Sequence, residues 1–300
     1  MSAVINPVLA AGERKLSLQQ RSYGDTGRKL SIIGFGGIVV MNAEQSHANE
    51  IVAQAVERGV NYFDVAPTYG DAQDRLGPAL EPFRDGVFLA CKTTQRLQKG
   101  AEEELHDSLK KLRTDHFDLY QLHGLAKMED LDAATGTGGA LETFVKAREK
   151  GLIRYIGFSA HSAEVAVEAM NRFDFDSVLF PFNYVTWHEG SFGPQVLAKA
   201  KEKNVARLAL KAMAHSPWPQ GASREKYGKC WYQPVLDEKE ADRALRFTLS
   251  LDITAAIPPG EEALFLQALD IAERFSVLTP EEEKEVKQMA QGVKPIFHSA

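Results

Sequence analysis

Four polar side chains of different chemistry stand at or just past the ends of apolar runs: Asp64 and Tyr69 in FDVAPTYG, Lys92 in VFLACKT and His123 in FDLYQLH. The runs are typical of strands, and helical patterns lie between them. If the strands are parallel neighbours in a barrel, their carboxyl ends meet at one mouth, where barrel enzymes hold their catalytic groups. The sequence therefore predicts one pocket that contains a carboxylate, a phenol, an ammonium and an imidazole.

The chemistry of such a pocket follows from acid strength. Free tyrosine has a pKa of about 10, so it is a poor proton donor to a carbonyl oxygen at neutral pH. An ammonium beside the phenol lowers that pKa, and a carboxylate paired with the ammonium keeps it in place and charged. The pattern predicts Tyr69 as a general acid and Lys92 as the group that lowers its pKa. Asp64 would hold Lys92, and the His123 imidazole would orient the carbonyl oxygen.

None of these four groups can supply electrons. A site that protonates a developing alkoxide needs a hydride donor, and a bound nicotinamide is the cofactor that provides one. The quartet therefore indicates a carbonyl reductase or alcohol dehydrogenase, with a small carbonyl compound as its partner.

These segments resemble the aldo/keto reductase superfamily, whose Asp, Tyr, Lys and His tetrad occurs in segments similar to NYFDVAPTYG, VFLACKTT and HFDLYQLH. Similar too are SIIGFGG, GLIRYIGFSAHS and ITAAIPPG, so the resemblance runs from about Ser22 to about Asp270. It implies a (β/α)8 TIM barrel whose bottom is closed by an N-terminal β-hairpin. It also implies NAD(P)-dependent reduction of aldehyde, ketone or sugar-like carbonyls to alcohols.

The resemblance further implies a cradle for the cofactor. The nicotinamide end would meet Gly37, Ile38, Ser159 and Asn183. The pyrophosphate and adenosine would lie along the backbone of Lys211, Ala212, Met213, Pro259 and Gly260.

The chain departs from the family at the nicotinamide. Ala160 and His161 follow the serine where members often have Asn, SVLFPFNYV lacks the usual glutamine, and Lys211 stands near the usual stacking tyrosine. A ring held poorly cannot reach a productive hydride geometry. An alternative is therefore a cofactor-binding redox sensor or regulatory subunit with little turnover.

The residues that follow the last predicted strand bear on whether the cofactor is NADP or NAD. NADP is the family default, and members often clamp its 2′-phosphate there with basic and hydroxyl groups. This chain has Glu261, Glu262 and Asp270 instead. Carboxylates repel a phosphate and accept hydrogen bonds from a ribose diol, so NAD is a second possibility.

A metal-dependent hydrolase on the same barrel is a further alternative, because one barrel hosts unrelated chemistries. His123, His161, His188 and His215 all follow predicted strands at the mouth. The chain lacks the close His-x-His pair with which such enzymes often begin. We expect no metal site.

Composition bounds the class of protein. The chain has 300 residues, 44% of them hydrophobic and 25% charged, which suits a globular protein with one barrel domain over residues 21–300 after a tail over residues 1–20. A formal net charge of -6 argues against nonspecific nucleic-acid binding. Cys91 and Cys230 offer neither a disulfide framework nor a zinc knuckle.

The segment MSAVINPVLAAGERK lacks the basic start of a secretory signal, and no later run approaches the ~20 apolar residues of a membrane span. We therefore expect a cytoplasmic protein that binds neither nucleic acid nor membrane. Nothing in the sequence selects an oligomeric state.

The elements that must position the tetrad alternate along the chain. Helical patterns such as AEQSHANEIVAQAVERG lie between the predicted strands, and Gly59 and Gly151 each follow a helix and precede a strand. Repeated strand–helix units favour a closed barrel, and no GxGxxG follows the first strand to indicate an open dinucleotide-binding sheet. The predicted strands span residues 32–35, 61–65, 87–92, 117–123, 154–159, 177–182, 206–211 and 253–257.

Two connections are unusually long, and both are expected to rise from the mouth: GLAKMEDLDAATGTGG after His123 and AHSPWPQGASREKYGKCWYQP after Lys211. The second carries aromatic residues that either line a substrate pocket or anchor the loop to the rim: Trp218, Tyr227, Trp231 and Tyr232. LSLQQRSYGDTGRKLSI predicts the hairpin, with its turn at Gly24 to Gly27. Cys91 precedes Lys92 on its strand and is expected to face the helices.

Overall fold

A closed parallel barrel forms the centre of the molecule in the computed structural model, which describes residues 18–299. Eight strands are hydrogen-bonded in the order β12-β9-β8-β7-β6-β5-β4-β3. The two ends of this sheet meet, because Ile33 bridges to Ala256 and the Gly34 N–H donates to the Ala256 carbonyl at 2.9 Å. The predicted TIM barrel is confirmed. The predicted tail lies outside the described residues up to residue 17.

All eight predicted barrel strands are present, with ends that shift slightly. Neighbouring strands are parallel, and their register places Lys92 beside Gln121. The strands are β3 (Phe35–Gly36), β4 (Tyr62–Asp64), β5 (Phe88–Thr93), β6 (Phe117–Leu125), β7 (Ile153–Ala160), β8 (Ser177–Phe180), β9 (Ala206–Leu210) and β12 (Ala255–Ile257).

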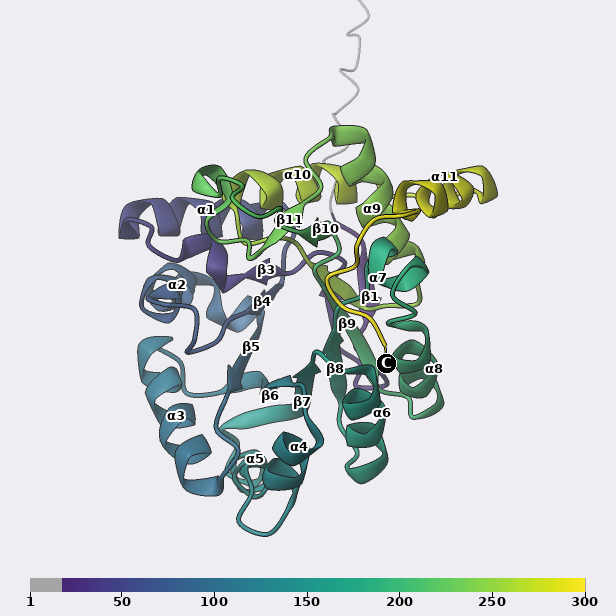
Figure 1. Cartoon of the computed structure of the whole chain (residues 1–300). Helices are drawn as coiled ribbons and strands as arrows, with labels where there is room; N and C mark the ends of the chain where they lie inside the picture. The colour runs from purple at the N-terminus through teal and green to yellow at the C-terminus, as the bar shows by residue number, and fades with distance from the viewer. Residues whose placement is uncertain (1–17, 300) are drawn as a thin grey trace, which may run out of the picture.

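Helices form a ring outside the strands (Figure 1). On α1, Ile51, Val52 and Ala55 are buried, as the apolar spacing of that segment predicts. The ring consists of α1 (Gln45–Glu57), α2 (Ala72–Leu80), α3 (Gln98–Lys111), α5 (Ala140–Glu149), α6 (Ala163–Arg172), α8 (Pro194–Glu202), α9 (Glu238–Ser250) and α10 (Glu262–Glu273). Shorter or additional helices are η1 (Gly37–Val40), η2 (Glu81–Gly86), η3 (Glu225–Tyr227), α4 (Met128–Thr135), α7 (Tyr184–His188) and α11 (Pro280–Ala290).

The predicted hairpin closes the bottom of the barrel. Strands β1 (Gln20–Ser22) and β2 (Lys29–Ser31) pair antiparallel. Between them, Tyr23 is fully buried and packs on Phe88 and Tyr155, with ring centroids 5.0 and 5.3 Å apart. Because these two residues lie near the amino ends of β5 and β7, the hairpin plugs the end of the barrel opposite the mouth.

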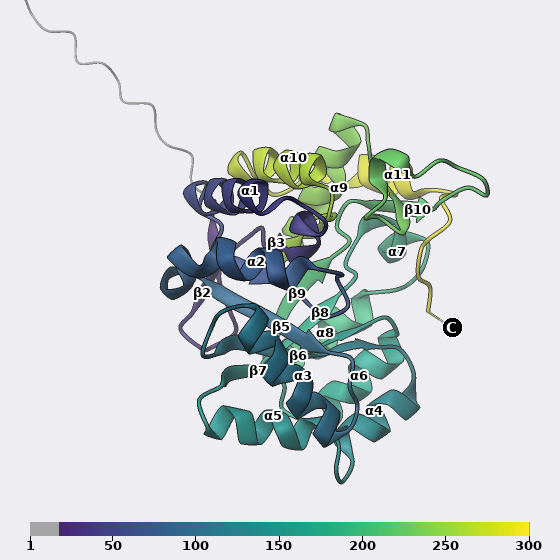
Figure 2. The same ribbon diagram turned by 90° about the vertical axis from the view of Figure 1, so that its left-hand side faces the viewer.

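The long connections at the mouth contain more regular structure than the sequence indicates. The segment after His123 is not an irregular loop, because α4 forms within it and buries Leu131 and Ala134. The segment after Lys211 forms an antiparallel pair, β10 (Ala214–Pro217) and β11 (Tyr232–Pro234). Figure 2 shows β10 and the end of the chain on one side of the barrel and β2 on the other.

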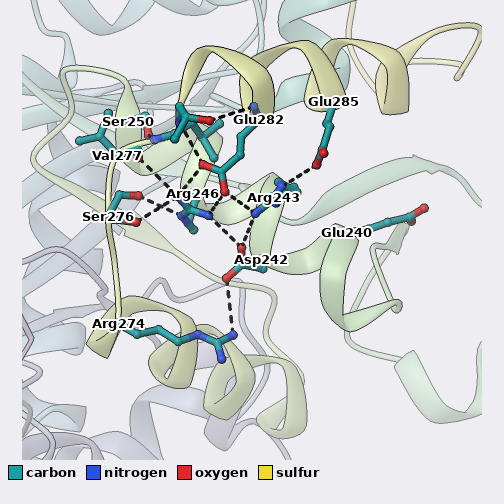
Figure 3. A network of polar contacts seen from close by, with 12 residues as sticks. Glu240, Asp242, Arg243, Arg246, Ser250, Arg274, Ser276, Val277, Glu282 and Glu285 are labelled. Carbon is teal, nitrogen blue, oxygen red and sulfur yellow. Dashed lines mark hydrogen bonds and ion pairs between the residues drawn. The ribbon is translucent and has the colours of Figure 1, made fainter.

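The C-terminal segment is fixed to the barrel by helix packing and by its own hydrogen bonds. Helix α11 lies against α9, where Arg243 and Arg246 face Glu282 (Figure 3). After α11 the chain turns back toward the mouth, and the Ser299 N–H donates to the Gly190 carbonyl at 2.9 Å. This return path brings Phe297 to the rim of the barrel.

Within residues 18–299, no helix is both long and apolar enough to cross a membrane.

Candidate active site

The four predicted catalytic residues lie in one pocket of about 210 Å³ at the carboxyl ends of the strands. Asp64 ends β4, Lys92 lies near the end of β5, and His123 lies near the end of β6. Tyr69 follows β4 on a tight turn in which Gly70 has a φ of 56°. Also lining the pocket are Ile38, Ser159, His161, Leu179, Leu210, Lys211, Lys229, Trp231, Tyr232, Ile257, Pro258 and Gly260.

Asp64 and Lys92 form a buried ion pair at the base of the pocket. Their side chains are 3% and 1% exposed, so water screens this contact poorly. The Gln121 amide donates to the second Asp64 oxygen at 3.0 Å, and the Tyr62 hydroxyl lies 3.4 Å from it. Burial is the largest single influence on the pKa of Lys92 and lowers it, but the charge and hydrogen bond of Asp64 together with the Tyr69 phenol outweigh burial, so the pKa is raised and Lys92 stays charged.

The Tyr69 hydroxyl lies 3.5 Å from the Lys92 ammonium. The predicted lowering of the Tyr69 pKa by Lys92 exists, but burial opposes it and is larger, so the net pKa is raised from its usual value. The prediction of a net lowered pKa is thus wrong for the protein alone, because the phenolate would lose water while facing both Lys92 and Asp64. Tyr69 is therefore a protonated phenol at neutral pH.

His123 is a neutral imidazole beside that phenol. Its ring meets the Tyr69 ring edge-on, with centroids 5.8 Å apart. Burial, followed by the nearby Lys92, lowers the pKa of His123 to about 3. The Arg96 guanidinium donates to the His123 carbonyl at 2.8 Å and so fixes the strand end that carries the ring.

The structure brings some of the predicted cofactor residues to this pocket. Four line it: Ile38, Ser159, Lys211 and Gly260. The Ser159 hydroxyl accepts a hydrogen bond from the Gly124 N–H at 2.8 Å. Gly37, Asn183, Ala212, Met213 and Pro259 are not among its lining residues.

Asn183 is fully buried at the start of α7, where its side-chain oxygen accepts from the Thr186 N–H at 2.9 Å. Its amide nitrogen has no partner among the described residues. An unpaired buried donor is costly, so this nitrogen is a candidate for contact with a bound group.

The aromatic residues of the second long connection divide between the two predicted roles. Trp231 and Tyr232 line the pocket. Trp218 instead donates from its indole N–H to the Cys230 carbonyl at 2.9 Å and stacks on Tyr227. The first pair faces the site and the second pair holds the loop together.

The sequence profile of the aldo/keto reductase family matches residues 33–290, which is most of the chain. The chain belongs to the aldo/keto reductase family. An uncharacterised oxidoreductase of Bacillus subtilis, YqkF, is 29% identical over 180 residues, which are 55% of this chain and 56% of the relative. The aldo-keto reductase YhdN of the same organism is 28% identical over 214 residues, 64% of this chain and 61% of the relative.

L-galactose dehydrogenase of Arabidopsis thaliana is 24% identical over 249 residues, which cover 76% of this chain and 74% of the relative. The aligned region thus spans only about three-fifths of the two Bacillus relatives. A solved aldo-keto reductase from Bacillus halodurans, in its holo form, superposes with a TM-score of 0.73 at 22% identity. That superposition covers 94% of this chain and all of the other, and it supports the shared fold.

Three features of this aldo/keto reductase pocket were missed by the sequence analysis as site features. Gln121 precedes His123 by two residues on β6, so strand alternation could have placed it on the same face. His161 was noted only as a departure from the family and as a candidate metal ligand, yet its ring contacts the Lys211 ammonium at 3.3 Å. For Lys229, no sequence feature other than its position in a long connection indicates that it lines the pocket.

Lys229 ties the second long connection across the pocket. Its ammonium donates to the Val39 carbonyl at 2.8 Å, and its N–H donates to the Glu261 carboxylate at 2.6 Å. The neighbouring Glu262 carboxylate contacts His47 at 2.6 Å and raises the pKa of that imidazole. Both carboxylates at the start of the acidic segment after β12 therefore have a partner: a backbone N–H for Glu261 and an imidazole for Glu262.

Of the four histidines of the hydrolase alternative, His123 and His161 line the pocket, whereas His188 and His215 are not among its lining residues. His188 packs against Phe247, and His215 contacts the Ser216 hydroxyl at 3.0 Å. In the part of the chain that the structure describes, no three His, Cys, Asp or Glu side chains could together hold a metal ion. Cys91 is buried beside Gln73, in contact at 3.3 Å, as expected for a packing residue.

Proposed function

We propose that this protein is an NAD(P)-dependent reductase of aldehydes, ketones or sugar-like carbonyls, in which Tyr69 donates the proton. One observation carries the proposal: the Tyr69 hydroxyl stands 3.5 Å from an ammonium that is itself held by a buried carboxylate. That arrangement favours a phenol that gives up its proton only when an alkoxide develops next to it.

Each residue has a separate task in this mechanism. The carbonyl oxygen of the substrate lies between the Tyr69 hydroxyl and the His123 imidazole, which orients it. As negative charge develops on that oxygen, Tyr69 transfers its proton and Lys92 stabilises the phenolate that remains. Asp64 keeps Lys92 charged and in place, and Gln121 holds Asp64.

A nicotinamide dinucleotide bound at this mouth would supply the hydride. The residues present fit such a group. The unpaired Asn183 amide suits a carboxamide partner, and Ile38, Lys211 and Gly260 border the pocket on the side of β3, β9 and β12. The altered residues after Ser159 leave the tetrad itself intact, which favours an enzyme over the sensor alternative.

NADP is the preferred cofactor in this proposal. The Glu261 carboxylate accepts a hydrogen bond from the backbone N–H of Lys229, and the Glu262 carboxylate contacts His47 and raises the pKa of that imidazole, so a protonated His47 would offset part of the negative charge in the expected 2′-phosphate region. Initial rates with NADPH and NADH at equal concentration test the choice. A clear preference for NADH would overturn it. A cytoplasmic location is also proposed, supported by two buried cysteines without a disulfide.

The Tyr69→Phe variant tests the function. We expect reduction of a carbonyl panel to fall by about 10²–10⁴-fold, while the dissociation constant for NADPH stays within about twofold. Tyr227→Phe, which removes a hydroxyl from the same mouth outside the pocket, is the control and should retain full activity. Full activity of Tyr69→Phe would refute the role of Tyr69. Binding of NADPH without multiple turnovers in the unaltered protein would instead favour the redox sensor.

A further inference from the structure

Among the described residues, one ammonium of the pocket has neither an anionic partner nor a hydrogen bond to an oxygen atom. Lys92 is paired with Asp64, and the Lys229 ammonium is bound to the Val39 carbonyl. Lys211 makes no ion pair with any residue from 18 to 299; its polar neighbour is the neutral ring nitrogen of His161 at 3.3 Å. An ammonium left without a carboxylate in a pocket is ready to receive one from a ligand.

Aromatic rings hold this ammonium in place without neutralising it. The Lys211 nitrogen lies 5.6 Å from the centre of the Trp231 ring and 5.7 Å from that of Phe297. The Phe297 ring also stacks on His161, with centroids 5.1 Å apart. Contacts between cations and ring faces fix the position of the charge and leave its hydrogen-bond donors available.

The backbone at Lys211 is in an unusual conformation. Lys211 follows β9 with a φ of 63°, in the left-handed region that non-glycine residues seldom adopt. Such a conformation costs free energy and persists at sites where a side chain must be held in a particular direction. Here that side chain enters the pocket that contains Tyr69 and His123.

The charge of the pocket supports the same conclusion. Three lysines line it, Lys92, Lys211 and Lys229, against the single carboxylate of Asp64. Burial and the repulsion of Lys92 lower the pKa of Lys211 to about 7. An incoming anion would reverse that effect, because an opposite charge favours the protonated amine. His161, with a pKa lowered to about 3 by burial, remains neutral beside it.

A larger cavity shares one lining residue, His161, with this pocket. A cavity of about 580 Å³ lies between α6, Phe192 and the C-terminal segment, and His161 lines both this cavity and the tetrad pocket. Its two carboxylates belong to Glu164 and Glu168 on α6, and Glu168 is paired with Arg172 at 2.8 Å. Because His161 borders both cavities, we expect a substrate with its carbonyl at Tyr69 to extend past His161 toward the larger cavity.

We propose that Lys211 and His161 form a subsite for an anionic group of the substrate, so that the preferred substrates are carbonyl compounds that carry a carboxylate or a phosphate. This inference rests on the proposed carbonyl reduction and narrows its substrate class. The Lys211 ammonium binds the anionic oxygens, and the Trp231 and Phe297 rings hold that ammonium in position. The backbone of Lys211 remains free for the cofactor.

Matched substrate pairs test the subsite. Succinic and glutaric semialdehydes are compared with their methyl esters, and glyceraldehyde 3-phosphate with glyceraldehyde. The unaltered protein should have a higher kcat/KM for the anionic substrate in the carboxylate pairs, in the phosphate pair, or in both. The pairs that show this preference tell which anion the subsite binds. Lys211→Met should lower kcat/KM for the anionic substrate of those pairs by about 10–100-fold and for its neutral partner by less than about threefold. Lys211→Arg, which keeps the charge, should retain most of the preference.

Three results would overturn the subsite. One is the absence of any preference for anions in the unaltered protein. Another is that Lys211→Met lowers kcat/KM equally for both substrates of each pair and also binds NADPH more weakly. That result would mean that the Lys211 amine binds a phosphate of the cofactor. The third is a loss specific to anionic substrates in Lys229→Met but not in Lys211→Met. If the subsite is correct, Lys229→Met should change kcat/KM by the same factor for the anionic and the neutral substrate of each pair.

A binding measurement separates failure of the subsite from failure of the proposed reduction. Succinate and inorganic phosphate are titrated by calorimetry into the protein saturated with NADP⁺. Even if no substrate is reduced, at least one of the two should bind about tenfold or more tighter to the unaltered protein than to Lys211→Met. Equal affinities in the two proteins would refute the subsite, whatever the turnover.

Discussion

On the outside of the barrel, Arg246 of α9 meets the Glu282 carboxylate of α11 through two contacts of 2.8 Å and also bonds to Asp242 at 3.2 Å (Figure 3). Arg243 and Arg274 contact the same acidic groups. In the pocket, by contrast, one carboxylate serves Lys92, and Lys211 has only a neutral imidazole and two rings. Charge is matched where helices pack and unmatched where a ligand would bind.

The two clusters also differ in exposure. Arg246 and Glu282 are 9% and 18% exposed, so their contacts remain partly hydrated at the edge of α11. Lys92 and Asp64 are almost completely buried. A buried ion pair costs more desolvation than it returns unless its geometry is very good, and such pairs contribute little to stability by themselves. The outer network therefore stabilises the packing of α11, whereas for the inner pair we propose a role in the chemistry of Tyr69.

Removing the inner cation should have the largest effect on activity. In Lys92→Met, Tyr69 loses the charge that stabilises its phenolate, so we expect kcat to fall by about 10²–10⁴-fold. The variant should also be less stable, because Asp64 is left buried and unpaired. The double variant Asp64→Asn with Lys92→Met should recover the stability, measured by urea denaturation, and not the activity. Activity that returned with stability would mean that the pair is only structural.

Removing the outer cation, Arg246, should lower the stability of the protein and leave its activity unchanged. Arg246→Met leaves Asp242 and Glu282 without their main partner, and we expect the free energy of unfolding to fall by about 2 kcal/mol. The kcat of the folded protein should not change, because α11 does not contribute to the pocket. A change in kcat at constant KM, with cofactor affinity preserved, would break the distinction between the two regions.

Acid should weaken the two regions in different pH windows. The Arg246 guanidinium lowers the pKa of Glu282 to about 2 from a usual 4.5, so its stabilising contribution is complete above pH 4.5 and disappears as the pH falls toward 2. His123 and His161, with pKa values lowered to about 3 from 6.5, stay neutral when the unfolded chain takes up protons. They therefore favour unfolding as the pH falls from 6.5 toward 3.

Denaturation curves at a series of pH values separate these contributions. Glu282→Gln should flatten the pH dependence of stability only below pH 4.5, and His161→Gln should flatten it from pH 6.5 down to about 3. The interval between pH 6.5 and 4.5 separates them: a change there in Glu282→Gln, or no change there in His161→Gln, would contradict the assignment.

The smallest expected effect is a gain in stability. The pKa of Lys211 is lowered to about 7 in the folded protein from 10.5, so below pH 7 the folded state carries an unfavourable charge, and stability rises between pH 7 and 10.5 as that charge is lost. Because Lys211 is partly exposed in the pocket, Lys211→Met should be more stable at pH 6 by only about 1 kcal/mol. The difference should vanish near pH 10.5. A loss of stability at pH 6 would show that Lys211 is adequately compensated.

The barrel strands could be predicted from sequence because each has an apolar run, and β4, β5 and β6 also carry a polar group at or near the carboxyl end. The Asp64, Lys92 and His123 positions follow from that pattern. Helix α4 could not be predicted, because its short apolar face, Leu131 and Ala134, stands among polar residues in a segment that resembles a loop.

The surroundings of the site residues could be predicted less well from the sequence. The net pKa of Tyr69 depends on how completely the folded barrel removes water from it, which no spacing reports. The contact of Phe297 with Lys211 joins the C-terminal segment to the end of β9, and residues so distant in sequence meet only through the complete fold. The pairing of Arg246 with Glu282 was missed for the same reason.

Transfer of label tests the central claim most directly. The protein is incubated with NADPH that carries deuterium in both positions at C4 and with succinic semialdehyde or another aldehyde of the panel, and the alcohol is analysed by mass spectrometry. Hydride transfer with Tyr69 as proton donor predicts one deuterium on the carbon that was the carbonyl. It also predicts almost no labelled alcohol from Tyr69→Phe, although that variant still binds NADPH. Unlabelled alcohol, or equal labelled product from Tyr69→Phe, would contradict the account.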